Sequence, residues 1–163
     1  MSVKRNLYAK TTLTLQKAKP RMLVICTGNS CRSQMAEGFL RDLTHGKVEV
    51  FSAGTHPTYV HPIAIRVMKE IGIDMSQHSS KSAELFKNEE LDYVITVCDH
   101  AREVCPTFPG AKKIFHTPFD DPVMFFGEEE NRLSKFRQVR DQIRTSMNEF
   151  VKKELKKEGT IAP

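Results

Sequence analysis

Apolar residues follow two patterns along the chain, short clusters and positions spaced by three or four residues. The clusters predict buried strands, which we place at 22–25, 48–53, 93–98 and 113–116. The helical spacing predicts amphipathic helices after Ser33, from Pro62 and from about Glu128, and a short helix or turn over 79–86. No linker or internal repeat divides the sequence.

Strands that alternate with helices favour a mostly parallel sheet with helices on both faces, an α/β fold of three layers. Ligand sites in such sheets lie beyond the carboxyl ends of the strands. Cys26 and Cys98 each come at the end of a predicted strand. We therefore expect both thiols at the same crevice.

Length and composition restrict the class of protein. The chain has 163 residues, with 39% hydrophobic and 28% charged side chains, which suits one domain with a sizeable core. No apolar stretch is long enough to cross a membrane, and residues 1–20 lack the apolar segment of a secretory signal. We expect a cytoplasmic protein with no membrane contact.

The net charge of +5 belongs to the beginning of the chain. Residues 1–20 carry five Lys or Arg side chains and no acid, whereas residues 21–163 balance. We therefore divide the chain into a basic, flexible tail over 1–20 and a single catalytic domain over 21–163. Charge confined to a tail does not indicate a nucleic-acid-binding face. We also expect a monomer. An acid-free basic start is also typical of an organelle-targeting peptide.

The candidate chemistry begins between the first strand and the first helix. This segment reads Cys26-Thr27-Gly28-Asn29-Ser30-Cys31-Arg32-Ser33. Backbone N–H groups at a helix N-terminus bind anions, Gly28 lets the backbone curl, and Arg32 offers a planar fork to two oxygens. We expect residues Thr27 to Ser33 to hold a tetrahedral oxyanion against the thiolate of Cys26.

The surroundings of Cys26 predict a reactive sulfur. A helix N-terminus and a nearby cation lower the pKa of a cysteine from about 8.5 to roughly 3.5–7.5. We therefore predict a thiolate at neutral pH, to which Ser33 donates a further hydrogen bond. The alternative is a buried cysteine at a strand end with Arg32 on the surface. The order of strand, loop and helix favours the functional interpretation.

A second pair of cysteines, Cys98 and Cys105, lies seven residues apart. If the segment between them is helical, the sulfurs stand roughly 10 Å apart at ~1.5 Å per residue. A disulfide needs Cα atoms within about 7 Å, so bonding would unwind the segment. Two alternatives stay open, an inert buried Cys98 and a zinc site with His100, although the usual paired zinc-ligand spacing is absent.

A carboxylate pair, Asp120 and Asp121, precedes Pro122 on a loop before the last helix. A thiolate that displaces an oxygen needs a proton donor for the leaving group. Two neighbouring carboxylates can hold one proton by mutual repulsion, and Asp121 is our candidate for the acid. The alternative is an ordinary Asp-Pro turn at the entry to a helix.

These residues resemble the thioredoxin-coupled arsenate reductases, which are built on the low-molecular-weight phosphotyrosine phosphatase fold. The resemblance extends from Val24 to about Asn148. Its landmarks are the segment 26–38, Ser52-Ala53-Gly54, the Cys98–Cys105 pair and Phe119-Asp120-Asp121-Pro122. The loop alone fits phosphatases and reductases equally, and the second cysteine pair selects the reductases. The resemblance implies a four-stranded parallel sheet flanked by helices.

The resemblance also implies a mechanism. Cys26 attacks arsenate and Asp121 protonates the departing oxygen. Cys98 then attacks Cys26, arsenite leaves, and Cys105 attacks Cys98 to free Cys26. Thioredoxin reduces the remaining disulfide, so that the thiols supply the electrons and we expect no metal or organic cofactor.

Some members of the family bind potassium beside the loop, at positions that match Asn29, Glu37, Ser52 and Lys81. Those members have an acid where this chain has Lys81, and a cation at this position disfavours a bound potassium ion. We predict that the Lys81 ammonium pairs with Glu37 instead and so steadies Asn29. The alternative is that Lys81 is a solvated helix residue.

Two other functions compete with arsenate reduction. A low-molecular-weight protein tyrosine phosphatase, acting through a cysteinyl-phosphate, needs Cys26, Arg32 and Asp121 but neither Cys98 nor Cys105. Those phosphatases usually have tyrosines after the Asp-Pro, where this chain has Val-Met-Phe-Phe. Weak phosphatase activity is compatible with either enzyme. A non-catalytic oxyanion-binding or redox-sensing module would need neither the acid nor a thiol relay.

Overall fold

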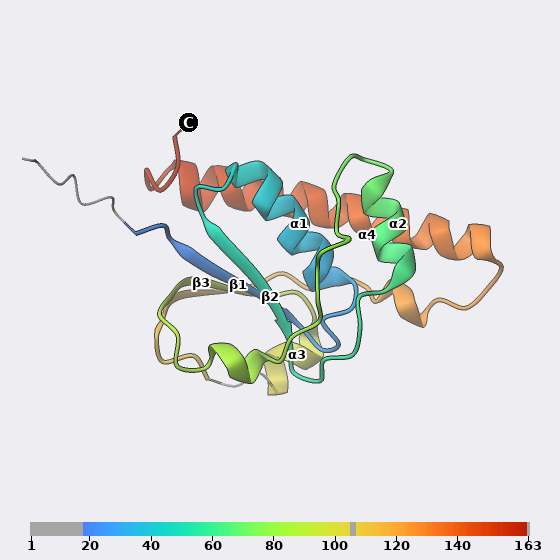
Figure 1. The fold of residues 1–163 in the computed structure, drawn as a ribbon, viewed down its shortest axis with the longest axis horizontal. Helices are drawn as coiled ribbons and strands as arrows, with labels where there is room; N and C mark the ends of the chain where they lie inside the picture. Colours follow the sequence, from blue (N-terminus) through green and yellow to red (C-terminus); the bar gives the residue numbers. More distant parts are fainter. Residues whose placement is uncertain (1–17, 105–106, 163) are drawn as a thin grey trace, which may run out of the picture.

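The computed structural model describes residues 18–104 and 107–162 (Figure 1). Most of the predicted tail over 1–20 therefore lies outside the described residues. The longer elements are β1 (Arg21–Cys26), α1 (Arg32–Thr44), β2 (Glu49–Gly54), α2 (Pro62–Lys69), β3 (Leu91–Thr96), α3 (Asp99–Val104), β4 (Ala111–His116) and α4 (Glu129–Phe150). Two 3₁₀ turns, η1 (Ala83–Phe86) and η2 (Pro122–Met124), and a π-helical turn, η3 (Val151–Lys156), complete them.

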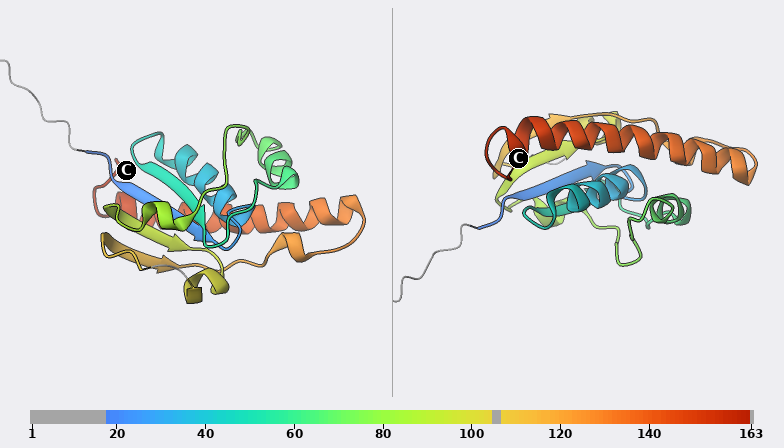
Figure 2. Two further views of the ribbon diagram at one scale, coloured as in Figure 1. Left: turned by 60° about the horizontal axis from the view of Figure 1, so that its bottom comes forward. Right: turned by 90° about the horizontal axis from the view of Figure 1, so that it is seen from above.

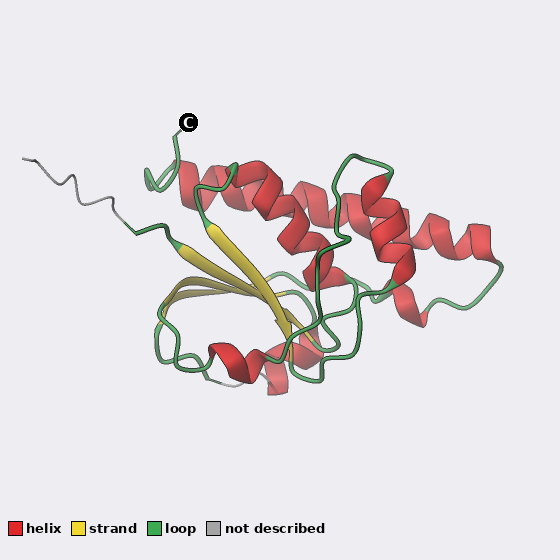
Figure 3. Cartoon of the chain, in the orientation of Figure 1, coloured by secondary structure: helices red, strands yellow, loops and turns green. Residues whose placement is uncertain are grey.

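The sheet has four strands in the order β2-β1-β3-β4, and all neighbours are parallel (Figure 3). This confirms the predicted fold class. In this register Leu23 lies beside Phe51 and Val94, and Val94 lies beside Ile114. Laterally paired residues of a sheet share a face, so these four side chains point to the same side.

Helices cover the two faces unequally (Figures 1 and 2). On one face α1 and α4 pack against each other and on the sheet, and Phe150 of α4 meets Tyr93 and Phe115 edge-on. The other face carries only short elements within the described ranges. There Phe86 of η1 packs on Phe51, with ring centroids 5.5 Å apart, and α3 lies along β1 and β3.

Several predicted element boundaries change, and two of the changes alter how an element ends. The third strand ends at Thr96 and not at Cys98, because the chain turns into α3 at Asp99, three residues after Thr96. The long last helix ends as a regular α-helix at Phe150 and continues as the π-helical turn η3, whose Leu155 is fully buried. No helix in the described part of the chain has the length and apolarity to cross a membrane.

Candidate active site

The predicted loop lies where β1 ends and α1 begins, as the order of strand, loop and helix indicates. It lines a cavity of about 430 Å³ with Cys26, Thr27, Gly28, Ser30, Cys31 and Arg32. His56, Thr58, Tyr59, Asp121 and Val123 complete the wall. Gly54 at the end of β2 is required beside this loop, because a Cβ there would lie 2.5 Å from the carbonyl oxygen of Thr27.

A chain of buried hydrogen bonds supports the side chain of Cys26, the candidate nucleophile. The Cys26 Sγ lies 2.8 Å from Ser33 Oγ, and Asn29 Nδ2 donates to Ser33 Oγ and to Ser52 Oγ, each at 2.9 Å. Ser52 donates onward to Glu37. Because Ser33 already accepts from Asn29, its own proton is available to Cys26. The hydrogen bonds of this network are therefore directed so that they stabilise a negatively charged Cys26 sulfur.

Asn29 has the unusual backbone geometry that this network needs. Its φ is 44°, in the left-handed region, where Asn is tolerated better than most residues. Its Oδ1 accepts the backbone N–H of Lys81 at 2.8 Å, which fixes the orientation of the amide. The predicted grouping of Asn29, Glu37, Ser52 and Lys81 under the loop is therefore present.

The predicted ion pair between Lys81 and Glu37 is wrong. The Lys81 ammonium donates to the carbonyl oxygen of Ser79 at 2.8 Å. Glu37, only 2% exposed, pairs instead with Arg41 at 2.6 Å, one helical turn further along α1. Lys81 steadies Asn29 through its backbone, and the cation that compensates the buried carboxylate is Arg41.

Several supporting residues were not predicted. Gln34 Nε2 donates to the carbonyl oxygens of Asn29 and Ser79, and its Oε1 lies 2.9 Å from Nδ1 of His78. Ser80 donates to the Gly28 carbonyl oxygen. The sequence does hold a signal for both: Gln34 extends the polar run at the start of α1, and Arg41 lies four residues after Glu37 on the same helix.

The predicted low pKa of Cys26 is wrong. Burial raises the pKa of the Cys26 thiol above its usual value, while the hydrogen bond from Ser33 and the charge of Arg32 lower it without overcoming the loss of solvent. Burial also raises the pKa of Cys31 well above its usual value. Cys31 therefore stays a thiol packed beneath the loop, where its carbonyl oxygen accepts the N–H of Met35.

We expect Ser33→Ala to slow alkylation of Cys26. The variant removes the donor that opposes burial, so the pKa of Cys26 rises further and the thiolate fraction at neutral pH falls by about threefold to tenfold. Rates of iodoacetamide labelling of Cys26, measured across a pH range, test this. Ser76→Ala, at an exposed site that contacts Asp74, is the control. An unchanged pH profile for Ser33→Ala would contradict the role of the hydroxyl.

Arg32 and Asp121 form an ion pair across the cavity. Arg32 Nη2 lies 2.7 Å from Asp121 Oδ2, and its Nη1 donates to the Phe119 carbonyl oxygen at 3.0 Å. The two residues are 89 positions apart in sequence, and the structure brings them together as predicted for an anion-binding arginine and an acid. The guanidinium thus faces Asp121, and an oxyanion that binds Arg32 must compete with this carboxylate.

The predicted sharing of a proton between Asp120 and Asp121 is wrong. Asp120 is exposed and pairs with Lys135 at 3.3 Å, whereas Asp121 pairs with Arg32. Each carboxylate has its own cation. Asp121 Oδ1 also accepts the N–H of Val123, which is the Asp-Pro turn of the alternative interpretation. Asp121 alone lines the cavity and remains the candidate acid.

Cys98 lies beside the loop. Its Sγ is 3.4 Å from Oγ1 of Thr27, the residue that follows the nucleophile, and it accepts the N–H of Ala101 at 3.3 Å. Cys26, Cys31 and Cys98 are all buried and unbonded to one another. The predicted partner Cys105 lies outside the described residues, and so does the zinc alternative that requires it.

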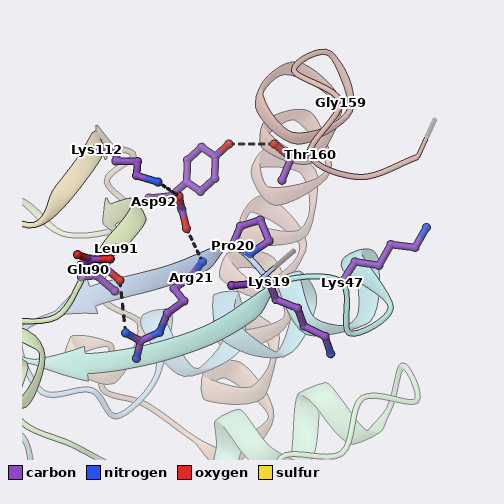
Figure 4. Close-up of a pocket in the computed structure, with 12 residues that line it drawn as sticks. Lys19, Pro20, Arg21, Lys47, Glu90, Leu91, Asp92, Lys112, Gly159 and Thr160 are labelled. Carbon is purple, nitrogen blue, oxygen red and sulfur yellow. Dashed lines mark hydrogen bonds and ion pairs between the residues drawn. The ribbon is translucent and has the colours of Figure 1, made fainter. Parts of the chain in front are cut away.

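A larger cavity, of about 620 Å³, opens at the opposite end of the sheet (Figure 4). Arg21 and Lys112 line it and are paired there with acids, Lys112 with Asp92 at 2.7 Å and Arg21 with Glu89 at 2.6 Å. None of the described residues that line this cavity is a cysteine. The chemistry predicted from the sequence therefore gathers at the carboxyl ends of the strands.

The comparison with known families agrees with this geometry. The model of the family described as low molecular weight phosphotyrosine protein phosphatase matches residues 21–161. The chain belongs to this family. Its phosphatase-like loop, Cys26 to Ser33, lies within the matched range, as do Cys98 and Asp121.

Several relatives of this chain are named arsenate reductase. One from Halalkalibacterium halodurans is 43% identical over 126 residues, covering 77% of this chain and 91% of the relative. One from Bacillus subtilis is 40% identical over the same length and the same coverage. The predicted family resemblance is confirmed.

Several solved structures share the fold. An arsenate reductase in an oxidized state superposes with a TM-score of 0.70 at 34% identity, covering 83% of this chain and 98% of the other. An arsenate reductase in a phosphate-binding state gives a TM-score of 0.69 at 33% identity, covering 82% and 98%. Vibrio vulnificus Wzb in complex with benzylphosphonate gives 0.69 at 22% identity, covering 83% and 99%, and shows the fold alone.

Proposed function

We propose that this protein reduces arsenate to arsenite, with thioredoxin as the final electron donor. The observation that carries the proposal is the position of Cys98, whose thiol contacts Thr27 beside the nucleophile. Hydrolysis of a phosphate ester needs only the loop, Arg32 and Asp121. A second buried thiol at this place supplies what a reduction needs, namely a second sulfur within reach of the first.

The first step binds arsenate in the loop, since arsenate has the shape and charge of phosphate. Its oxygens displace Asp121 from the fork of Arg32, and the carboxyl group of Asp121 is then free to take up a proton. The proton of the Cys26 thiol passes to the bound oxyanion or to Asp121. The sulfur attacks arsenic, and the departing oxygen leaves as water with a proton from Asp121.

The second step is the reduction. The Cys98 thiolate attacks Cys26 Sγ, a sulfur–sulfur bond forms, and the sulfur–arsenic bond breaks with its electron pair remaining on arsenic. Arsenic(V) thereby becomes arsenic(III), which leaves as arsenite, and the two thiols become a disulfide. Cys105 then attacks Cys98 and frees Cys26. A dithiol of thioredoxin reduces the Cys98–Cys105 disulfide.

One pair of assays tests the proposal. Arsenate-dependent oxidation of NADPH is followed in the presence of thioredoxin and thioredoxin reductase, beside hydrolysis of an aryl phosphate. We expect rapid arsenate-dependent oxidation and at most slow hydrolysis. The second candidate is a tyrosine phosphatase, favoured by the exposed ring of Tyr59 on the cavity wall. Rapid hydrolysis without arsenate reduction would establish that candidate and refute the reductase.

We also propose that the enzyme is indifferent to potassium. Arg41 already supplies a positive charge to the buried carboxylate of Glu37, and it is anchored by two further donations to the Val50 carbonyl oxygen. A monovalent cation has no uncompensated acid to bind there. Replacing sodium by potassium at constant ionic strength should leave the rate of arsenate reduction unchanged, and a several-fold stimulation would contradict this.

A further inference from the structure

His116, at the end of β4, is fixed at both ring nitrogens. Its Nε2 lies 2.9 Å from Oδ1 of Asp99, and its Nδ1 lies 2.8 Å from Oγ1 of Thr96, the laterally paired residue at the end of β3. Because the Asp99 carboxylate can only accept, Nε2 is the donor of this hydrogen bond. The ring thus ties the sheet to the first residue of α3.

Besides the His116–Asp99 pair, α3 contacts β1 and β3, and the ring centroid of His100 lies 6.3 Å from that of His56. Of its side chains that the structure describes, only Ala101 is buried, and Asp99, His100, Arg102 and Glu103 are exposed. A cavity of about 590 Å³ lies beside the helix. Arg102 and His116 line it together with Val94 and Ile114 of the sheet. The helix is therefore not tightly packed on this side, and the His116–Asp99 pair anchors its first turn.

The first turn of α3 also determines where Cys98 lies. Cys98 directly precedes Asp99, and its sulfur accepts the N–H of Ala101 from the same turn. That orientation brings the sulfur to 3.4 Å from Thr27 Oγ1. A shift of the first turn would move the Cys98 sulfur away from the loop that carries Cys26.

We propose that His116 and Asp99 are positioning residues that keep Cys98 docked against the Cys26 loop. They touch neither substrate nor the reacting sulfurs, and they act by holding the turn that contains Cys98. The assignment of a chemical step to Cys98 rests on the proposed function, but the docking itself does not. In the reductase, loss of the pair slows the attack of Cys98 on the Cys26–arsenic adduct.

Residue-specific alkylation tests the docking without any substrate. The full chain, with its thiols reduced, is labelled with iodoacetamide at several pH values, and the rates at Cys98 and Cys26 are read by peptide mass spectrometry. His116→Ala and Asp99→Ala should each raise the rate at Cys98 about threefold at every pH and leave the rate at Cys26 unchanged. The double variant should raise it no further, because both changes break one interaction.

Two further variants distinguish the loss of the His116–Asp99 interaction from a general loosening of the fold. His116→Gln keeps an N–H near the position of Nε2 and should return the Cys98 rate toward that of the wild type. Glu103→Ala removes another exposed carboxylate from α3 and should change nothing. Additive effects of the two alanine substitutions, or an unchanged rate at Cys98 in Asp99→Ala, would overturn the proposal. Asp99 is exposed, so its variant poses little risk to folding.

Single-turnover measurements connect the docking to the reaction. Arsenite release after one mixing of reduced enzyme with arsenate should slow by a similar factor in His116→Ala, with phosphate binding unchanged. If the wild type forms no arsenite, the proposed function fails while the labelling result still decides the docking. If the wild type reduces arsenate and His116→Ala releases arsenite at the same rate, the positioning role is refuted.

Discussion

Cys98→Ser should abolish catalytic turnover of arsenate, with a loss of at least about 10³-fold. A serine oxygen can accept the N–H of Ala101 and contact Thr27 as the sulfur does, so the fold and the loop should persist. It cannot form a bond to Cys26 that leaves an electron pair on arsenic. The variant therefore binds the oxyanion, and its chemistry stops at the Cys26–arsenic adduct.

The measurement is the amount of arsenite formed per enzyme molecule. The wild type should exceed one equivalent many times over in the presence of thioredoxin, and Cys98→Ser should form none. Phosphate binding by the same variant is the control for an intact loop. Sustained arsenite formation by Cys98→Ser would show that Cys26 is reduced by an external thiol directly, and the relay would have to be abandoned.

Cys105→Ser distinguishes the last transfer from the earlier ones. In this variant Cys98 can still attack Cys26, so about one equivalent of arsenite should form before the enzyme stalls as a Cys26–Cys98 disulfide. Continued cycling with thioredoxin would exclude a role for Cys105 in regeneration. The pair of variants thus assigns each cysteine to its own step.

The fold could be predicted from the sequence because the apolar strand patterns, the helical spacing and the order of the elements all agree. The strand at 22–25 is apolar throughout, as a strand buried on both faces must be, and the helical spacing after Ser33 begins where α1 begins. The loop after β1 could be predicted equally well, since its residues are contiguous and a parallel sheet places them at the carboxyl ends of the strands. Local sequence patterns reveal sites of this kind, whose residues follow one another in the chain.

The wrong predictions concern the burial of a side chain and the choice of an ion-pair partner, which local sequence patterns do not determine. The donors around Cys26 are visible in the sequence, but the depth of its burial is not, and burial decides the direction of its pKa. Lys81 and Arg41 are both plausible partners for Glu37 by composition. Only the path of the backbone shows that Lys81 turns its ammonium toward Ser79, whereas the spacing of four residues on one helix already favoured Arg41.

Asp121→Asn should produce two opposite effects on arsenate reduction. The turnover number should fall by roughly 10² to 10⁴, because an amide cannot protonate the departing oxygen. Affinity for the oxyanion should increase at the same time. The Asp121 carboxylate pairs with Arg32 at 2.7 Å and so competes with the substrate, and a neutral amide competes less strongly.

Asp120→Asn is the matched control, since it changes the adjacent acid, which pairs with Lys135 away from the cavity. It should leave both turnover and affinity close to those of the wild type. Steady-state kinetics with arsenate, together with calorimetric titration of phosphate as a non-reducible ligand, separate the two effects. If Asp121→Asn lowered turnover and weakened phosphate binding together, the carboxylate would be holding Arg32 ready for the anion rather than competing with it. The exchange of partners proposed for the first step would then be wrong, even though Asp121 remained the acid.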